Sequence, residues 1–351
     1  MHTPSELLQR LLERRDLTQA QAEELLAHLT DPELPPAMAG ALLAALSTKG
    51  VVADELRGLA LTMRRLARRP EIPAGIRAID IVGTGGDGSG SLNISTGTAL
   101  LTAACGVPVV KHGNRSVSSR CGSADVLQAL GLGIPPDPRS AAASLAATGF
   151  TYLFAPHYHP ATARLVPIRA ALGVRTVFNI LGPLVNPVQP PLHLVGAFST
   201  EVARLMAETF QGLPIERTFV VHGAQGWDEP TPIGPFTVFD VRPGQVSRGV
   251  RSPAQYGLAL CSPADLGGGD AAHNARALEA VLTGKERGAH RDCLLLGTAL
   301  ALELHGETPD PREGIARAAA AIDSGAAGRL LDELRRLGAP DTSSSASGGA
   351  P

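Results

Sequence analysis

The chain has 351 residues, 44% of them hydrophobic, so it can bury a large core in one or two domains. Its 31 basic and 33 acidic residues leave a formal net charge of −2, which gives no overall field to attract nucleic acid or a membrane. The four cysteines are far apart and no apolar run reaches the roughly 20 residues of a membrane span, so we expect a soluble cytoplasmic protein without a disulfide framework or zinc site.

Residues 1–73 are predicted to form a helical domain. Thr3-Pro4-Ser5-Glu6 and Thr18-Gln19-Ala20-Gln21 match the capping box that begins a helix. Apolar residues at helical spacing follow each box and predict two amphipathic helices. Further helices are expected over 37–46 and 53–69, and the prolines that follow mark the end of this part.

The pattern changes after residue 76. Segments rich in β-branched residues alternate with alanine-rich helices and predict a mainly parallel sheet, with strands at 78–82, 107–110, 151–154, 193–198, 218–221 and 236–241. Active sites of such sheets lie beyond the carboxyl ends of the strands, where we expect Asp87, Lys111, His157 and His222 to converge.

Residues 160–190 are predicted to be helical again and to join the N-terminal helices. The α/β domain is therefore expected to comprise residues 74–159 and 191–340. Residues 341–351 are rich in serine, glycine and alanine, and we expect them to form a disordered tail.

Residues 80–96 form a glycine-dense loop between an apolar strand and a helix. Glycines let several amide N–H groups converge on one anion, and Asn93, Ser95 and Thr96 add donors at a helix N-terminus. Asp87 would repel a phosphate unless a cation lies between them, so the loop predicts a metal-bound polyphosphate. The loop also matches the dinucleotide fingerprint, but Lys111 stands where that motif needs an acid. A purely structural turn is the third interpretation.

Two further polar clusters fit this hypothesis. Lys111 and the hydroxyl residues after it supply a point charge and donors for phosphate, although polar loops at strand ends are common. Asp228 and Glu229 offer the hard oxygen ligands that Mg²⁺ prefers, although such a pair is usually solvated surface. The predicted polyphosphate site favours the magnesium interpretation.

A fourth cluster contains His157, His159 and Arg169. The two histidines suggest a metal site, but no third ligand lies at a spacing typical of one. Structural histidines in the core or in a loop are therefore the more common interpretation. Arg169 has the geometry to bind a carboxylate, with a solvated helix arginine as the alternative.

Six segments, taken together and in this order, resemble the anthranilate phosphoribosyltransferase family. They are Gly83-Thr84-Gly85-Gly86-Asp87, Asn93-Ile94-Ser95-Thr96, Lys111-His112-Gly113-Asn114-Arg115-Ser116, Gly122-Ser123-Ala124-Asp125-Val126-Leu127, Phe178-Asn179-Ile180-Leu181-Gly182-Pro183-Leu184 and Asp228-Glu229. The resemblance extends to about Leu337, and single motifs are shared with pyrimidine nucleoside phosphorylases of the same fold.

The resemblance implies an enzyme of tryptophan biosynthesis that joins anthranilate to phosphoribosyl pyrophosphate (PRPP) and releases pyrophosphate. It implies an α/β fold of the nucleoside phosphorylase and class II phosphoribosyltransferase type, with a small N-terminal helical domain and a large, mainly parallel-sheet domain. It also implies a homodimer and two Mg²⁺ ions.

The family's functional positions map onto this sequence motif by motif. PRPP binding falls to Gly83, Gly86, Asp87, Asn93, Ser95, Thr96, Lys111 and Ser123. Anthranilate binding falls to Gly83, Asn114, His159, Arg169 and Gly182, with His112 and Pro183 nearby. Metal binding falls to Ser95, Asp228 and Glu229. No general base is assigned, because the weakly basic aromatic amine needs orientation more than deprotonation.

The sequence departs from the family pattern at a few positions. Trp227 replaces the usual leucine before the acid pair and Pro230 follows the pair, which puts the shape of this metal loop in question. The usual asparagine near the end is Gly297. A pyrimidine nucleoside phosphorylase and a non-catalytic nucleic-acid-binding paralogue are the alternative functions.

Overall fold

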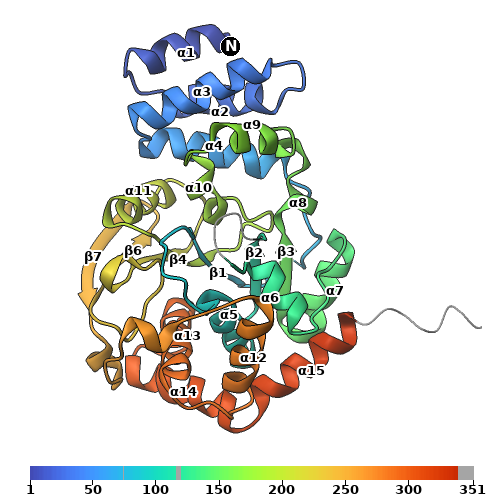
Figure 1. Ribbon diagram of the computed structural model, residues 1–351, viewed down its shortest axis with the longest axis vertical. Coiled ribbons are helices and arrows are strands. Elements are labelled where there is room, and N and C mark those ends of the chain that lie inside the picture. The colour runs from blue at the N-terminus through green and yellow to red at the C-terminus, as the bar shows by residue number, and fades with distance from the viewer. Residues whose placement is uncertain (74, 116–119, 339–351) are drawn as a thin grey trace, which may run out of the picture.

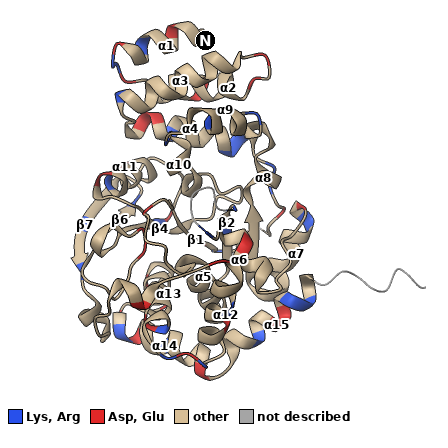
Figure 2. Cartoon of the chain, in the orientation of Figure 1, with Lys and Arg blue, Asp and Glu red and all other residues tan. Residues whose placement is uncertain are grey.

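The computed structural model describes residues 1–73, 75–115 and 120–338, so the predicted tail at 341–351 lies outside the described residues. Figure 1 shows a bundle of helices at the N-terminal end above a larger α/β part. Basic and acidic residues are interspersed along both parts (Figure 2). Within the described residues, no helix combines the length and apolar character that a bilayer span needs.

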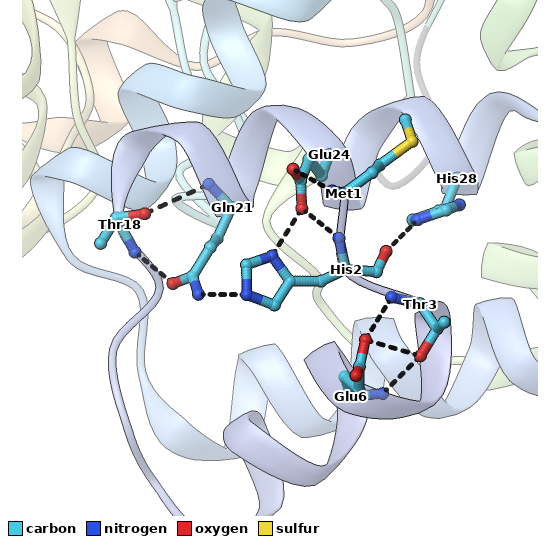
Figure 3. A network of polar contacts seen from close by, with 8 residues as sticks. All are labelled: Met1, His2, Thr3, Glu6, Thr18, Gln21, Glu24 and His28. Atoms are coloured by element: carbon cyan, nitrogen blue, oxygen red, sulfur yellow. Dashed lines mark hydrogen bonds and ion pairs between the residues drawn. The ribbon is translucent and has the colours of Figure 1, made fainter.

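The bundle consists of α1 (Pro4–Leu12), α2 (Gln19–Thr30), α3 (Pro36–Lys49) and α4 (Ala53–Leu66). Both predicted capping boxes are present, at Thr3 and Thr18. The predicted helix 53–69 is too long, because Ala67 is already extended and the Arg68 N–H donates to the carbonyl of Tyr158 at 2.8 Å. The N-terminal residues are fastened to α2 by the His2 ring on Glu24 at 2.8 Å and by His28 on the His2 carbonyl (Figure 3).

The sheet has seven strands in the order β3-β2-β1-β4-β5-β6-β7. Their bounds are β1 (Ile79–Gly83), β2 (Val109–Gly113), β3 (Phe150–Phe154), β4 (Leu192–Gly196), β5 (Arg217–His222), β6 (Phe236–Arg242) and β7 (Gln245–Arg251). The first five are parallel, while β6 and β7 are antiparallel. The predicted α/β class with a mainly parallel sheet is therefore confirmed.

Two strand predictions need correction. Lys111 was expected after a strand ending at residue 110, but it lies inside β2, whose pairing with β3 continues to Gly113. The edge strand β7 was missed, because its residues are mostly exposed on both faces and lack an apolar alternation.

The remaining helices cover the two faces of the sheet or connect its strands. Their bounds are α5 (Ile94–Ala104), α6 (Ser123–Ala129), α7 (Pro138–Thr148), α8 (Ala155–Tyr158), α9 (Leu165–Leu172), α10 (Phe178–Leu181), α11 (Thr200–Phe210), α12 (Ala271–Leu282), α13 (Ala289–His305), α14 (Pro311–Asp323) and α15 (Ala326–Gly338). One hydrophobic core joins a sheet face to α5, α12, α13, α14 and α15. A second core is continuous from the bundle through α4 and α11 to the opposite face, with Leu59, Phe210 and Val220 among its members.

The segment after β3 returns to the bundle. Helix α9 packs on α3, and the Arg164 guanidinium donates to the carbonyls of Leu29 and Leu34. The buried Arg64 of α4 donates from Nε to the carbonyl of Leu184 at 2.7 Å. The connection from α8 to β4 is therefore held by the helical bundle while it lies above the sheet.

Candidate functional site

The loop that carries the acid pair crosses the carboxyl ends of β4 and β5 at very close range. A Cβ on Gly196 would lie 1.5 Å from the Asp228 carbonyl oxygen, and one on Gly223 would lie 2.1 Å from that of Glu229. Only glycine permits this approach at both positions. Trp227, the unusual residue before the pair, is 6% exposed in the core below the loop, and its carbonyl accepts from the Gly223 N–H at 2.8 Å. Trp227 thus anchors the acid loop.

The glycine loop after β1 is bonded directly to these acids. The Gly85 N–H donates to Asp228 Oδ2 at 2.5 Å, and the Asp228 N–H donates to Asp87 Oδ2 at 3.3 Å. The other Asp87 oxygen accepts from the Ser89 N–H at 3.0 Å. Gly86 has φ +75°, a conformation that strains any residue with a Cβ. Two segments that are distant in the sequence therefore form one polar cluster, as the Gly85–Asp228 and Asp87–Asp228 bonds show.

The N-terminus of α5 and a buried lysine complete this cluster. The Ser95 N–H donates to Glu229 Oε1 at 3.0 Å, and Lys111 Nζ lies 3.3 Å from Ser95 Oγ. Lys111 is 1% exposed and also donates to the Ile81 carbonyl. Burial lowers the pKa of Lys111, opposed by the negative charges of Asp80, Glu229 and Asp228. In its protonated form, Lys111 places a positive charge between β1 and the N-terminus of α5.

If Asp87, Asp228 and Glu229 were all ionised, they would carry more negative charge than one lysine balances. Burial raises the pKa of Asp228, and the neighbouring Asp87 carboxylate raises it further. Burial likewise raises the pKa of Glu229, with Asp228 as the next cause. A buried group of carboxylates with raised pKa values is stabilised by a cation.

The donor set fits Mg²⁺ delivered with a phosphate substrate. Among the described residues, no group of three or more His, Cys, Asp or Glu side chains is arranged as a complete metal cage. Mg²⁺ is usually bound by one or two carboxylates together with substrate phosphates and water. Asp228, Glu229 and the Ser95 hydroxyl supply oxygen ligands of that kind, beside backbone amides suited to phosphate.

A pair of buried histidines lies on the bundle side of β2. The His112 and His159 rings meet edge to face with centroids 5.2 Å apart, and His112 Nδ1 lies 3.3 Å from the Gly182 carbonyl oxygen. Burial lowers the pKa of His112 to about 3 and that of His159 to about 4. Both rings are therefore neutral near pH 7, and they contribute polar but uncharged side chains to this part of the molecule.

Three of the predicted binding residues have partners that the sequence did not indicate. Ser123 Oγ donates to the Asn114 carbonyl at 3.2 Å and lies 2.9 Å from the Tyr152 hydroxyl. Asn93 donates to the Cys121 carbonyl at 3.2 Å and accepts from Asn274 at 2.9 Å. Gly182 follows α10 directly and, through its carbonyl, holds the His112 ring.

Arg169 comes from a different part of the molecule. It lies on α9, partly buried, with its guanidinium 5.2 Å from the Phe178 ring centroid. Burial lowers the pKa of this guanidinium, which stays protonated at neutral pH because its ordinary value is about 12.5 or higher. Its ring partner Phe178 opens α10, the short helix that ends just before Gly182, so α10 connects Arg169 to the residue that accepts from His112.

The predicted residues therefore fall into two groups on either side of β2. The glycine loop, the α5 N-terminus, Lys111 and the acid pair form one group. His112, His159 and Gly182 form the other, and Arg169 is connected to it through Phe178 of α10. The described contacts join neither His157 nor His222 to these groups: the His157 ring packs on Phe154, and His222 bonds the Ala197 carbonyl at 2.8 Å. Their chain positions after strands do not determine where their rings point.

The sequence also missed supporting residues. Asp80 is fully buried, accepts from the His112 N–H at 3.2 Å and from Asn186 at 2.9 Å, and burial raises its pKa to about 6. An acid inside an apolar strand is a signal that could have revealed it. Tyr152 and Asn274 gave no comparable signal, because their polar partners are distant in sequence.

Comparisons with known proteins agree with this geometry. Residues 75–328 match the model of the glycosyl transferase family a/b domain, and residues 5–67 match that of its helical bundle domain. Anthranilate phosphoribosyltransferase from Synechococcus sp. (strain JA-3-3Ab) is 44% identical over 329 residues, covering 94% of this chain and 96% of that protein.

Solved structures give the same result. The crystal structure of anthranilate phosphoribosyltransferase from Thermus thermophilus has a TM-score of 0.88 and 39% identity, and covers 94% of this chain and 98% of that one. The Saccharomyces cerevisiae enzyme in complex with PRPP and Mg has a TM-score of 0.86 and 27% identity, with 95% and 97% covered. These matches support phosphoribosyl transfer rather than nucleoside phosphorolysis or nucleic-acid binding. The chain therefore belongs to the anthranilate phosphoribosyltransferase family, the glycosyltransferases of tryptophan biosynthesis.

Proposed function

We propose that the two groups of residues around β2 form the site where this chain transfers the phosphoribosyl group of PRPP to the amine of anthranilate and releases pyrophosphate. One observation carries the assignment: the buried Asp228 and the partly buried Glu229 accept hydrogen bonds from the amides of the glycine loop and of the α5 N-terminus. Both amides are the donors that a phosphate would use.

The PRPP side consists of Gly83, Gly86, Asp87, Asn93, Ser95, Thr96, Lys111 and Ser123. We assign two Mg²⁺ ions to it, held by Ser95, Asp228 and Glu229 together with substrate oxygens. Bound Mg²⁺ supplies charge neutralisation for the departing pyrophosphate. Asp228 and Glu229 would hold the ions, which would leave the Gly85 and Ser95 amides to donate to phosphate oxygens. Protonated Lys111 would add positive charge on the leaving-group side.

The anthranilate side consists of Gly83, Asn114, His159, Arg169 and Gly182, with His112 and Pro183 beside them. The guanidinium of Arg169 is suited to the anthranilate carboxylate. The neutral rings of His112 and His159 provide an uncharged wall for an aromatic substrate. No general base is needed, since orienting the weakly basic amine toward the sugar carbon provides the main catalytic effect on this side.

We further propose that residues 1–73 and the helices near 160–190 act as one domain against residues 74–159 and 191–340, that the enzyme is cytoplasmic, and that it forms a homodimer through the helical part. Leu12 on α1 and Val166 on α9 are 64% and 62% exposed, so the helical part carries apolar side chains that a second copy would cover.

The test is the release of pyrophosphate by the purified chain with anthranilate, PRPP and Mg²⁺, together with fluorescence detection of the phosphoribosyl product. We expect turnover that requires all three components. Phosphorolysis of uridine or thymidine with inorganic phosphate, in place of that turnover, would contradict the proposal and support a nucleoside phosphorylase.

A further inference from the structure

Arg175 lies in the short connection between α9 and α10, a segment to which sequence analysis gave no role. Gly173 ends α9 with φ +64°, and the Thr176 N–H donates to Asn179 Oδ1 at 2.9 Å as the next helix begins. The backbone of Arg175 is therefore fixed on both sides, while its side chain is exposed.

The Arg175 side chain reaches across to the glycine loop. Its Nη2 donates to the Gly86 carbonyl, and a Cβ on Gly86 would lie 3.2 Å from the same nitrogen. The guanidinium carbon lies 4.7 Å from the centroid of the Phe198 ring. Phe198 is itself fastened to the loop, because its N–H donates to Thr84 Oγ1 at 3.3 Å. An aromatic ring and the loop backbone thus hold the guanidinium in place.

Arg175 differs from other arginines in how its charge is paired among the described residues. Within the described parts of the chain, no carboxylate forms an ion pair with it, whereas Arg115 pairs with Asp125 and Arg217 pairs with Asp240. A guanidinium has five N–H donors, and the Gly86 carbonyl uses one of them. A phosphate group accepts two such donors in parallel and carries the opposite charge, so it is a better partner than a lone carbonyl.

We propose that Arg175 is a further PRPP-binding residue, whose guanidinium donates to a phosphate group of PRPP held by the glycine loop. The inference rests on the PRPP site proposed above. Arg175 would add a positive charge from the connection between α9 and α10, whereas the other residues of the PRPP site lie on or next to the sheet. PRPP would therefore bridge the sheet to the segment that also carries Arg169, and the two substrate sides would be linked through one short connection.

The test is calorimetric titration of Mg-PRPP into Arg175→Ala, Arg175→Lys and the wild type, without anthranilate, with inorganic pyrophosphate as a second probe. We expect Arg175→Ala to weaken PRPP binding by about tenfold to a hundredfold, the usual effect of losing a charged hydrogen bond. Arg175→Lys should lose less PRPP affinity than Arg175→Ala, because lysine keeps the positive charge and lacks only the bidentate geometry of the guanidinium. The loss in Arg175→Ala should shrink at high salt.

Arg248→Ala is the matched control. Arg248 is also exposed and stacks on a phenylalanine, Phe239, at 5.9 Å, but it lies on the edge strand β7. The Arg248→Ala variant should bind PRPP with wild-type affinity. PRPP affinity in Arg175→Ala equal to that of Arg248→Ala, with or without a lower melting temperature, would overturn the inference. Failure of the wild type itself to bind PRPP would instead contradict the proposed function. Pyrophosphate binding that weakens alongside PRPP would place the contact on the diphosphate, whereas unchanged pyrophosphate binding would place it on the 5-phosphate.

Discussion

Replacing Arg169 with alanine should separate the two substrates. Arg169 lies on α9, held against α3, and among the described residues it contacts the Phe178 ring rather than an acid. Its cation is thus available for the anthranilate carboxylate. A charged hydrogen bond in a partly buried site contributes about 1.5–3 kcal/mol, which corresponds to roughly a tenfold to hundredfold loss in kcat/KM for anthranilate.

The structural cost of the same change is small. The lost contact with Phe178 is a partly buried cation–π interaction worth about 0.5–1 kcal/mol, so the melting temperature should fall by no more than about 4 °C. PRPP affinity should stay near the wild-type value, because the ring that Arg169 contacts belongs to α10 and not to the glycine loop, the α5 N-terminus or the acid pair.

The assay combines steady-state kinetics in each substrate with calorimetric titration of Mg-PRPP. Arg204→Ala, which removes an exposed ion pair with Glu208 on α11, serves as the control and should change neither substrate's kinetics. An equal loss of PRPP affinity in Arg169→Ala would refute the assignment, as would an unchanged kcat/KM for anthranilate.

Three further results are expected. Asp228→Asn should raise the Mg²⁺ concentration that gives half the maximal rate by about tenfold or more, since one charged metal contact is lost. An unchanged Mg²⁺ requirement in kinetic titrations would mean that the acid pair is structural and does not bind the metal. Tyr152→Phe, which removes the hydroxyl 2.9 Å from Ser123 Oγ, should raise KM for PRPP by about twofold to tenfold at constant kcat, and a fall in kcat alone would contradict this. Burial lowers the pKa of His193 to about 3, so the unfolded chain binds the extra proton and stability is lost as pH falls from about 6.5 toward 3. Between pH 7 and pH 5 the wild type should therefore lose about 2 kcal/mol more unfolding free energy than His193→Leu in urea titrations, and parallel losses would show that His193 does not titrate on unfolding.

The sequence by itself determined the local features of this protein. Thr3 and Thr18 begin helices because capping boxes act within four residues, and the glycines at 83–88 allow backbone conformations such as φ +75° at Gly86 whatever surrounds them. The ordered motifs also carried the family and its chemistry, since ligand types such as the Asp228-Glu229 pair are visible as residues. The edge strand β7 was missed because an exposed strand carries no apolar alternation.

Only the tertiary structure decided which groups act together. The bonds from Gly85 to Asp228 and from Ser95 to Glu229 join residues more than 130 positions apart. They form because parallel strands bring their carboxyl ends to one sheet edge and because Gly196 and Gly223 let the acid loop lie directly on it. The tertiary structure also decided the charge state of the two histidines. His112 and His159 are neutral because folding removes them from water, and their burial depends on packing rather than on the residues next to them in the sequence. The contact between Arg175 and Gly86 likewise depends on the tertiary structure. The two residues are 89 positions apart in the sequence, and they meet because the helical bundle holds the connection between α9 and α10 above the glycine loop.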